Sequence, residues 1–384
     1  MHDSENIAHR ITCVVPQALG GRALEALRDL GVRHLLKENA RNVRRRRVRR
    51  RFAHSGYVDR LDNSPAEIYR FQADPSVSAA AIGHLAAALE MQIPARGTIY
   101  AEAVTSHVTA PQILDKVPAG RGGRGPALLQ DLMLITCIMS MSGSGQELAK
   151  VALELGTGVP IITLGVGTGL CDRLGLLRIT VPPEKELVHL IAPAADADGL
   201  VRILIENGRL NRPGRGFIYC TPVKYGVLDT SVTIGRREHA ASIEQIITAV
   251  DDLKQGTAWR RRFPEGDPEA DIRLQRNNRA ITVVCGEEQS RKYIQVAMQA
   301  GAAGATTSQV QRPAMGDASN GPRQRSTIVV EPGTVAPVVG ALLSACSEIS
   351  SGLEYLEVQP VPTVFSYHAA SLKGNAAQGL PSTA

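Results

Sequence analysis

Two short segments carry residues that suit an anionic ligand. One is Gly165-Val166-Gly167-Thr168, and the other is Arg212-Pro213-Gly214-Arg215-Gly216. Glycines let a backbone approach a ligand closely and point its amides at phosphate oxygens, while arginine supplies a fixed, forked positive charge. Either segment alone could equally be an ordinary turn. Taken together, they predict a nucleotide- or phosphate-binding site made of Gly165, Gly167, Thr168, Arg212, Gly214, Arg215 and Gly216.

A run of arginines is the second candidate site. The stretch 41–51 holds eight arginines and no acidic residue, so the rest of the chain is near −2 although the whole carries +6. So many like charges repel one another, which favours a function over an inert solvated loop. We interpret the run as a partner-binding loop that contacts an acidic protein face, an anionic membrane surface or nucleic acid. Its contact residues would be Arg44, Arg45, Arg46, Arg47, Arg49, Arg50 and Arg51.

An internal repeat predicts the elements that position these residues. Three β-branched runs open with isoleucine, at 11–15, 135–139 and 281–285, and each is followed by a helical pattern that ends in glycine. A second strand-like run, a second helical stretch and a Gly-x-x-Tyr segment then follow in each copy, the last at 97–100, 216–219 and 352–355. Landmarks that recur three times in one order indicate a tandem repeat.

Each copy has the order β-α-β-loop-β-α-β, which predicts an α+β fold of three ferredoxin-like units. Such a unit has an antiparallel sheet with both helices on one face, so its other face needs a cover. With three units in one chain, we expect each to be covered by the other two. The expectation is therefore a monomeric, single-chain pseudo-trimer.

The domain boundaries follow from the repeat and from composition. Units are expected at 10–109, 128–235 and 279–366. A Gly-, Pro- and Arg-rich linker occupies 110–127, a connector with one amphipathic helix occupies 236–278, and the tail 367–384 is expected to be disordered.

Composition narrows the class of protein. The hydrophobic fraction of 43% is ample for packed cores, and no apolar run is long and unbroken enough to span a membrane. The six cysteines show no metal-ligand spacing, and no secretory signal opens the chain, so a cytoplasmic protein is expected. We find no nucleophile–base pair, P-loop or paired carboxylates, and predict neither an enzyme nor a tightly bound cofactor.

The middle copy resembles the PII signalling family. The match lies in the segments 163–168, 184–188 and 211–219, is good across 132–223, fair across 10–104, and only architectural across 279–361. The resemblance implies a regulatory protein with an adenine nucleotide (ATP, ADP or AMP) or a related small anion as effector, bound in a cleft between units. It also implies that the long loop of a unit docks on a target such as a membrane transporter, an enzyme or a transcription regulator.

The copies differ, and other functions compete. The first copy has Asn39-Ala40-Arg41-Asn42 in place of the glycines, and the third has no arginine before Gly352, so at most one cleft is complete. RNA recognition motifs share the strand order, which makes an RNA-binding protein with an arginine-rich loop the main alternative. The strands lack the basic-Gly-aromatic signature of those domains. An amino-acid-sensing module of the same topology is a third possibility.

Overall fold

The computed structural model describes residues 6–49, 57–108, 113–118, 127–169, 183–229, 272–315, 321–349 and 353–367. Arg50 and Arg51 lie outside these residues. So do most of the linker at 110–127 and of the connector at 236–278, and nearly all of the tail at 367–384.

The elements come in three runs along the chain. The first comprises β1 (Asn6–Pro16), α1 (Gly20–Leu30), β2 (Leu36–Arg49), β3 (Tyr57–Ala73), α2 (Pro75–Ala88) and β4 (Thr98–Val108). The second comprises β5 (Leu132–Met139), α3 (Ser144–Glu154), β6 (Ile161–Gly169), β7 (Glu184–Pro193), α4 (Ala197–Asn207), β8 (Gly216–Val223) and β9 (Tyr225–Val227). The third comprises β10 (Gln275–Gly286), α6 (Glu287–Gln299), β11 (Gly304–Arg312), β12 (Gly321–Val330), α7 (Pro332–Glu348) and β13 (Tyr355–Ser366).

The strands do not form three separate sheets. They join into one 13-stranded sheet in the order β11-β12-β10-β13-β8-β5-β7-β6-β2-β3-β1-β4-β9. Further antiparallel pairings of β11 with β6 and β2, and of β13 with β4, close the sheet into an antiparallel barrel of ten strands. The expected α+β fold of three tandem ferredoxin-like units in a single-chain pseudo-trimer is therefore wrong.

The physical reason for the closure lies in the edge strands. An edge strand leaves a row of backbone N–H and C=O groups without partners, and closing a sheet satisfies them. Here the edges of one run pair with those of another: Thr363 of β13 lies opposite Cys220 of β8, and Arg41 of β2 lies opposite Ile162 of β6. Backbone hydrogen bonds thus make the three runs one structure.

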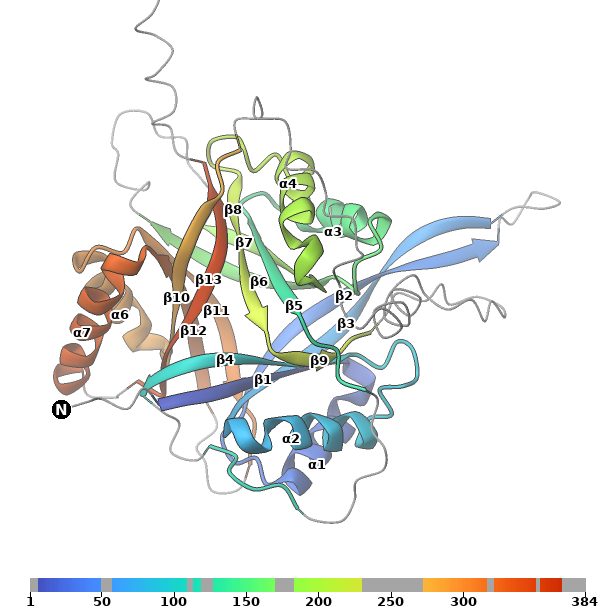
Figure 1. The fold of residues 1–384 in the computed structure, drawn as a ribbon, viewed down its shortest axis with the longest axis horizontal. Coiled ribbons are helices and arrows are strands. Elements are labelled where there is room, and N and C mark those ends of the chain that lie inside the picture. Colours follow the sequence, from blue (N-terminus) through green and yellow to red (C-terminus); the bar gives the residue numbers. More distant parts are fainter. Residues whose placement is uncertain are drawn as a thin grey trace, which may run out of the picture.

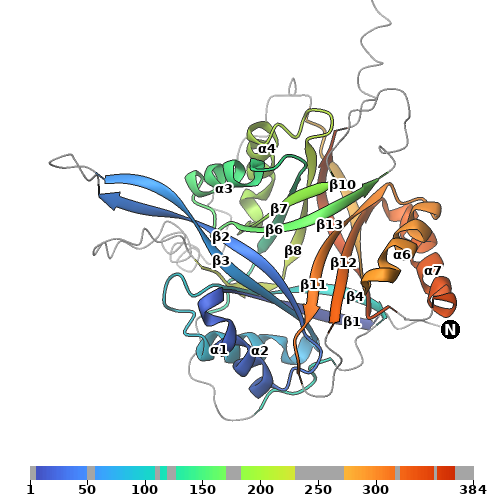
Figure 2. The ribbon, with the colours of Figure 1, turned by 180° about the vertical axis from the view of Figure 1, so that it is seen from behind.

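Helix pairs cover the outer face of the barrel on three sides (Figures 1 and 2). Because strand residues alternate between faces, one set of positions packs under the helices and the other points inward. In β10, Ile281 and Val283 join the apolar core beneath α6 and α7, whereas Thr282 and Val284 line the interior. The pairs α1–α2 and α3–α4 cover equivalent cores. Three apolar cores therefore surround one inner space.

Strands β2 and β3 continue past the barrel as a long hairpin, here called the arm (Figure 1). The arginine run lies on β2, in register with β3 from Arg44 opposite Asp62 to Arg49 opposite Tyr57. The expectation that the described part of this run, through Arg49, is a loop is therefore wrong. Extended pairing with β3 spaces the arginines along a ribbon.

The arginines nearest the barrel are engaged by the protein itself. Arg44 donates to Oδ2 of Asp229 at 2.6 Å and to the carbonyl oxygen of Ala95 at 3.3 Å. Arg41 donates to Oε1 of Glu186 at 2.7 Å, and Arg45 lies 3.7 Å from Oε1 of Glu154. These contacts hold the arm against the second run. The prediction of partner binding still applies to the arginines farther along β2, which are Arg46, Arg47 and Arg49.

Replacing Arg44 with serine should destabilise the protein. The side chain of Asp229 is only 3% exposed, so without Arg44 it would be a buried carboxylate that has lost its cation. Burial already raises the pKa of Asp229 against the opposing effect of Arg44, so protonation would relieve part of the loss. We expect the free energy of unfolding in urea to fall by about 3 kcal/mol, the low end for breaking a buried ion pair.

Arg45→Ser is the matched control, since that arginine pairs with an exposed partner, and it should change stability by no more than about 0.5 kcal/mol. Equal stability of both variants and the native protein would show that the arginines do not anchor the arm.

Candidate functional site: the polar interior of the barrel

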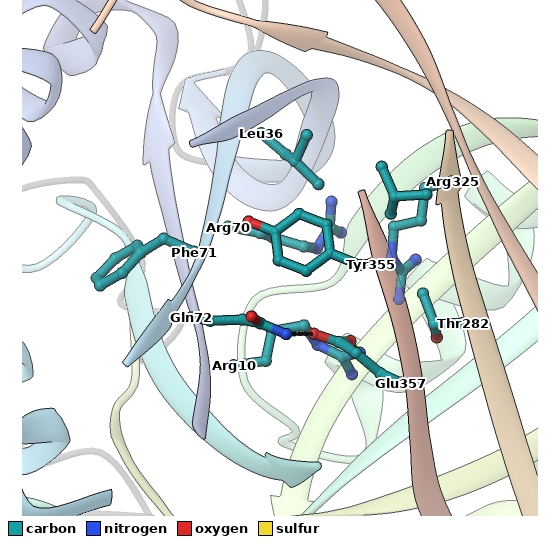
Figure 3. A pocket seen from close by; sticks show the side chains of 10 residues that line it. Arg10, Leu36, Arg70, Phe71, Gln72, Thr282, Arg325, Tyr355 and Glu357 are labelled. Carbon is teal, nitrogen blue, oxygen red and sulfur yellow. Dashed lines mark hydrogen bonds and ion pairs between the residues drawn. The ribbon is translucent and has the colours of Figure 1, made fainter. Parts of the chain in front are cut away.

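Two adjoining cavities lie inside the barrel. Arg10, Arg70 and Arg325 line both of them. The larger cavity is also lined by hydroxyl groups, those of Tyr100, Thr136, Tyr219, Thr221, Thr306, Ser308 and Thr327. The smaller is bounded by Tyr355, Gln72 and Glu357 (Figure 3). The three guanidinium groups therefore border both the larger cavity, which is rich in hydroxyl groups, and the smaller cavity, which is lined by the aromatic ring of Tyr355.

Arg10 is fixed by carboxylates from two other strands. Its guanidinium donates hydrogen bonds to Oε2 of Glu357 at 2.7 Å and to Oε2 of Glu102 at 2.9 Å. It also donates to Oε1 of Gln359 at 2.6 Å. Burial lowers the pKa of Arg10, but the two carboxylates outweigh it and leave the pKa above its ordinary value. Gln72 donates to the other oxygen of Glu357 at 2.6 Å. Both terminal nitrogens of Arg10 are therefore engaged, while its Nε has no hydrogen-bond partner among the described residues.

Arg70 is also paired. Its guanidinium donates to Oε2 of Glu38, and both side chains are less than 10% exposed. Burial raises the pKa of Glu38, but Arg70 and the more distant Arg325 outweigh it and hold the pKa below its ordinary value. Glu38 is therefore an anion that already has a partner.

Arg325 differs from the other two. Within the described part of the chain, its guanidinium makes no hydrogen bond and no ion pair. It points into the space that it shares with Arg70 (Figure 3), it lines both cavities, and its side chain is partly exposed. Burial, followed by the charges of Arg70 and Arg10, lowers the pKa of Arg325 to about 10. Removing a cation from water costs free energy, and the cost is higher when its nearest charges are mostly other cations. A bound anion would lower that cost.

His189 in the larger cavity is a neutral, oriented group. Burial lowers its pKa to about 4, against the opposing effect of Glu38. Its ring nitrogens lie 3.3 Å from Oγ1 of Thr136 and 3.1 Å from Oγ1 of Thr163. At neutral pH the imidazole therefore adds no charge to the site, and its two nitrogens are occupied by hydroxyls.

The size of the space limits what it can hold. The larger cavity has a volume of ≈ 30 Å³ and the smaller one of ≈ 10 Å³. A single water needs about 10–15 Å³ measured in this way, so the larger cavity has room for about two or three water-sized groups. It fits a small ion and excludes an adenine nucleotide.

The glycines of the expected phosphate site lie elsewhere. Gly165, Gly167 and Thr168 are inside β6, in register with β7 or β11, and therefore do not form the ordinary turn that was the alternative to a binding site. The amide of Gly167 donates to the carbonyl oxygen of Pro183 at 2.8 Å. A Cβ atom at Gly167 would overlap the side chain of Lys185. The overlapped atom of Lys185 is near the far end of a flexible side chain, which can move aside, so packing does not by itself require glycine here.

The second half of the expected site lies between α4 and β8. Arg212 and Gly214 are exposed in this connection, while the guanidinium of Arg215 contacts the sulfur of Met141. Gly216 has φ 131°, and a Cβ atom there would overlap the carbonyl oxygen of Ile138. Strands β5 and β7 separate β8 from β6, which places the two halves roughly 14 Å apart at the usual strand spacing. The structure does not bring them into one cluster, and nucleotide binding there stays a prediction.

The sequence did contain a signal for the interior residues. Arg10, Glu102 and Glu357 are charged residues beside apolar or β-branched neighbours in their strands, whereas Arg70 and Arg325 lie in strands that carry other charges as well. A lone charge at an inward position has to find a partner, but only the closed barrel shows which strands meet. The pairing register of the last strand also differs between the first and third copies. Tyr100 lies opposite Thr12, whereas Glu357, and not Tyr355, lies opposite Thr282.

Comparisons with known proteins leave the chain without a family. No protein-family profile and no curated protein matches it. Among solved structures, a microcompartment protein from Desulfitobacterium hafniense DCB is similar with 13% identity and a TM-score of 0.18, over 63% of this chain and 98% of that one. Aspartate kinase from Synechocystis is similar with 8% identity and a TM-score of 0.20, over 65% and 56%. Scores this low carry no argument, so the relation to the PII family stays a prediction.

Metal-ligand clusters and membrane-spanning helices are two further features that would indicate a function. Within the described ranges, no group of three or more His, Cys, Asp or Glu residues is placed to hold a metal ion. None of the helices that the structure describes has both the length and the apolar character needed to cross a membrane.

The pKa of His189 predicts a pH dependence of stability. Its pKa is 6.5 when unfolded and about 4 when folded, so the unfolded state binds the proton first as the pH falls. The native protein should lose on the order of 3 kcal/mol between these values through this group. His189→Gln should lack that contribution, giving a shallower slope in urea unfolding measured across this pH range. Identical slopes in the variant and the native protein would contradict a neutral, buried His189.

Proposed function

We propose that this chain is a regulatory protein that binds a small anion inside the barrel. The observation that carries the proposal is Arg325, whose guanidinium has no ion-pair partner among the described residues and points into a hydroxyl-lined cavity. A small effector anion would supply the missing charge. The cavity volume favours such an ion over the adenine nucleotides that a PII resemblance implies.

The same residues favour binding over catalysis. Groups that could transfer protons in the cavity are already engaged: Glu102 and Glu357 by Arg10, Glu38 by Arg70, and His189 by two threonines. Charges held in this way give a rigid, preorganised site.

The arm offers a route from the effector to a target protein. Glu38 lies on β2 and Arg70 on β3, and these are the two strands that continue into the arm. A change in charge beside Arg70 therefore acts on the base of the element that carries Arg46, Arg47 and Arg49. In this proposal, the distal arm contacts an acidic face of the target.

The alternative of RNA binding loses its main support. RNA recognition motifs stack bases on aromatic side chains of an open sheet face. The corresponding face here is the inside of a closed barrel, where Tyr100 and Tyr219 are less than 10% exposed. Neither ring offers a surface on which a base could stack.

Effector binding is tested by thermal unfolding. At constant ionic strength, millimolar formate, nitrate, hydrogencarbonate, phosphate or sulfate should be screened on the native protein and on Arg325→Leu. At least one anion should raise the Tm of the native protein, since a ligand that binds only the folded state stabilises it. The shift should vanish in Arg325→Leu, and ATP, ADP and AMP should give no shift that depends on Arg325. If no anion gives a shift that depends on Arg325, the proposal fails.

A further inference from the structure

The interior charges restrict the ligand more narrowly than its size does. Three guanidinium groups and the carboxylates of Glu38, Glu102 and Glu357 balance in number, but they do not balance in space. Two carboxylates contact Arg10 and one contacts Arg70, which leaves Arg325 as the one described interior arginine that touches none. A single uncompensated charge matches a single negative charge on the ligand. A dianion would bring a second charge close to Glu38 with no cation left to receive it.

The arrangement of donors restricts the shape. In register, Arg325 of β12 lies opposite Ser308 of β11, and Thr327 lies opposite Thr306. All four side chains line the larger cavity. The forked guanidinium offers two parallel N–H donors in one plane, which matches two oxygens of a planar group. The hydroxyls line the same cavity as the fork, where they can donate a hydrogen bond to a third oxygen or accept one from its O–H group.

We infer that the ligand is a monovalent, trigonal planar oxyanion, held in two-point contact by Arg325 and by the hydroxyls of Thr306, Ser308 and Thr327. Formate, nitrate and hydrogencarbonate have this chemistry, and each has three or four non-hydrogen atoms. This inference rests on the proposed function, which it narrows from small anions in general to one charge and one geometry.

The experiment compares anions that differ in one property at a time. Binding is measured by isothermal titration of the full chain with formate, nitrate and hydrogencarbonate, and with sulfate and hydrogenphosphate at pH 8, at matched ionic strength. The trigonal monoanions should bind at least tenfold more tightly than the tetrahedral dianions, the scale of one charge-assisted hydrogen bond. Among the monoanions, preference for hydrogencarbonate would show that a hydroxyl oxygen of the site accepts a hydrogen bond from its O–H group, and preference for nitrate or formate would show that the site only donates.

Three variants assign the effect to Arg325. Arg325→Leu should abolish binding, and Arg325→Lys, which keeps the charge but loses the fork, should weaken it about tenfold. Arg291→Leu, on the exposed face of α6, should bind like the native protein. Circular dichroism of each variant establishes that it is folded.

Failures of the two proposals are distinguishable. If sulfate or phosphate binds as tightly as the trigonal anions and this binding is lost in Arg325→Leu, the interior is an anion site but the inference of a planar monoanion is wrong. Equal binding of trigonal anions by Arg325→Lys and the native protein would also overturn the two-point contact. If none of these anions binds, both the inference and the proposed function fail.

Discussion

The ion network around Arg10 is the interaction on which the interior depends. One guanidinium on β1 joins Glu102 of β4 and Glu357 of β13, elements more than 200 residues apart in the chain. Both carboxylates and the arginine are nearly inaccessible, so each would be a buried charge without the others. The network therefore forms only when the first and third runs are docked. It links folding of the whole barrel to the arrangement of charges inside it.

Because strand residues alternate between the two faces of the sheet, outward and inward positions of the barrel can differ in polarity. Outward positions of the strands are apolar and pack beneath three pairs of helices, which supplies most of the hydrophobic burial. Inward positions are then free to be polar, provided that every charge finds a partner. Arg10 and Arg70 meet this condition and Arg325 does not. A fold with ample apolar cores can tolerate one such defect, and strained or uncompensated groups of this kind tend to mark functional sites.

How much was predictable from sequence depended on the range of the interaction. The runs at 11–15, 135–139 and 281–285, which open with isoleucine, are strands, as their β-branched composition predicts, because that preference is local. The ferredoxin-like, pseudo-trimeric architecture was wrong because the pairings that close the barrel join residues such as Thr363 and Cys220, which no periodicity relates. The interpretation of the arginine run as a loop failed for a similar reason: β3 supplies the pairing that makes Arg44 part of a strand.

The candidate site was missed because its residues have no common motif. Arg70 and Arg325 come from different runs, and each lies among other polar residues of its own strand, so neither stands out in the sequence. Glycine-rich segments indicate turns, yet Gly167 lies within β6, in register with Thr306 of β11. Identifying the interior required knowing which strand faces are inward, and that follows from the closed sheet alone.

In the proposed function, Arg325 is retained for a ligand although it lowers the stability of the fold. The most direct test of this claim is the free energy of unfolding of Arg325→Leu in a buffer free of small oxyanions. Because the substitution removes a buried charge that has no partner, the account predicts a variant that is more stable than the native protein by about 1 kcal/mol or more. A variant destabilised by a similar amount would show that Arg325 is a structural member of the network, and would contradict the account.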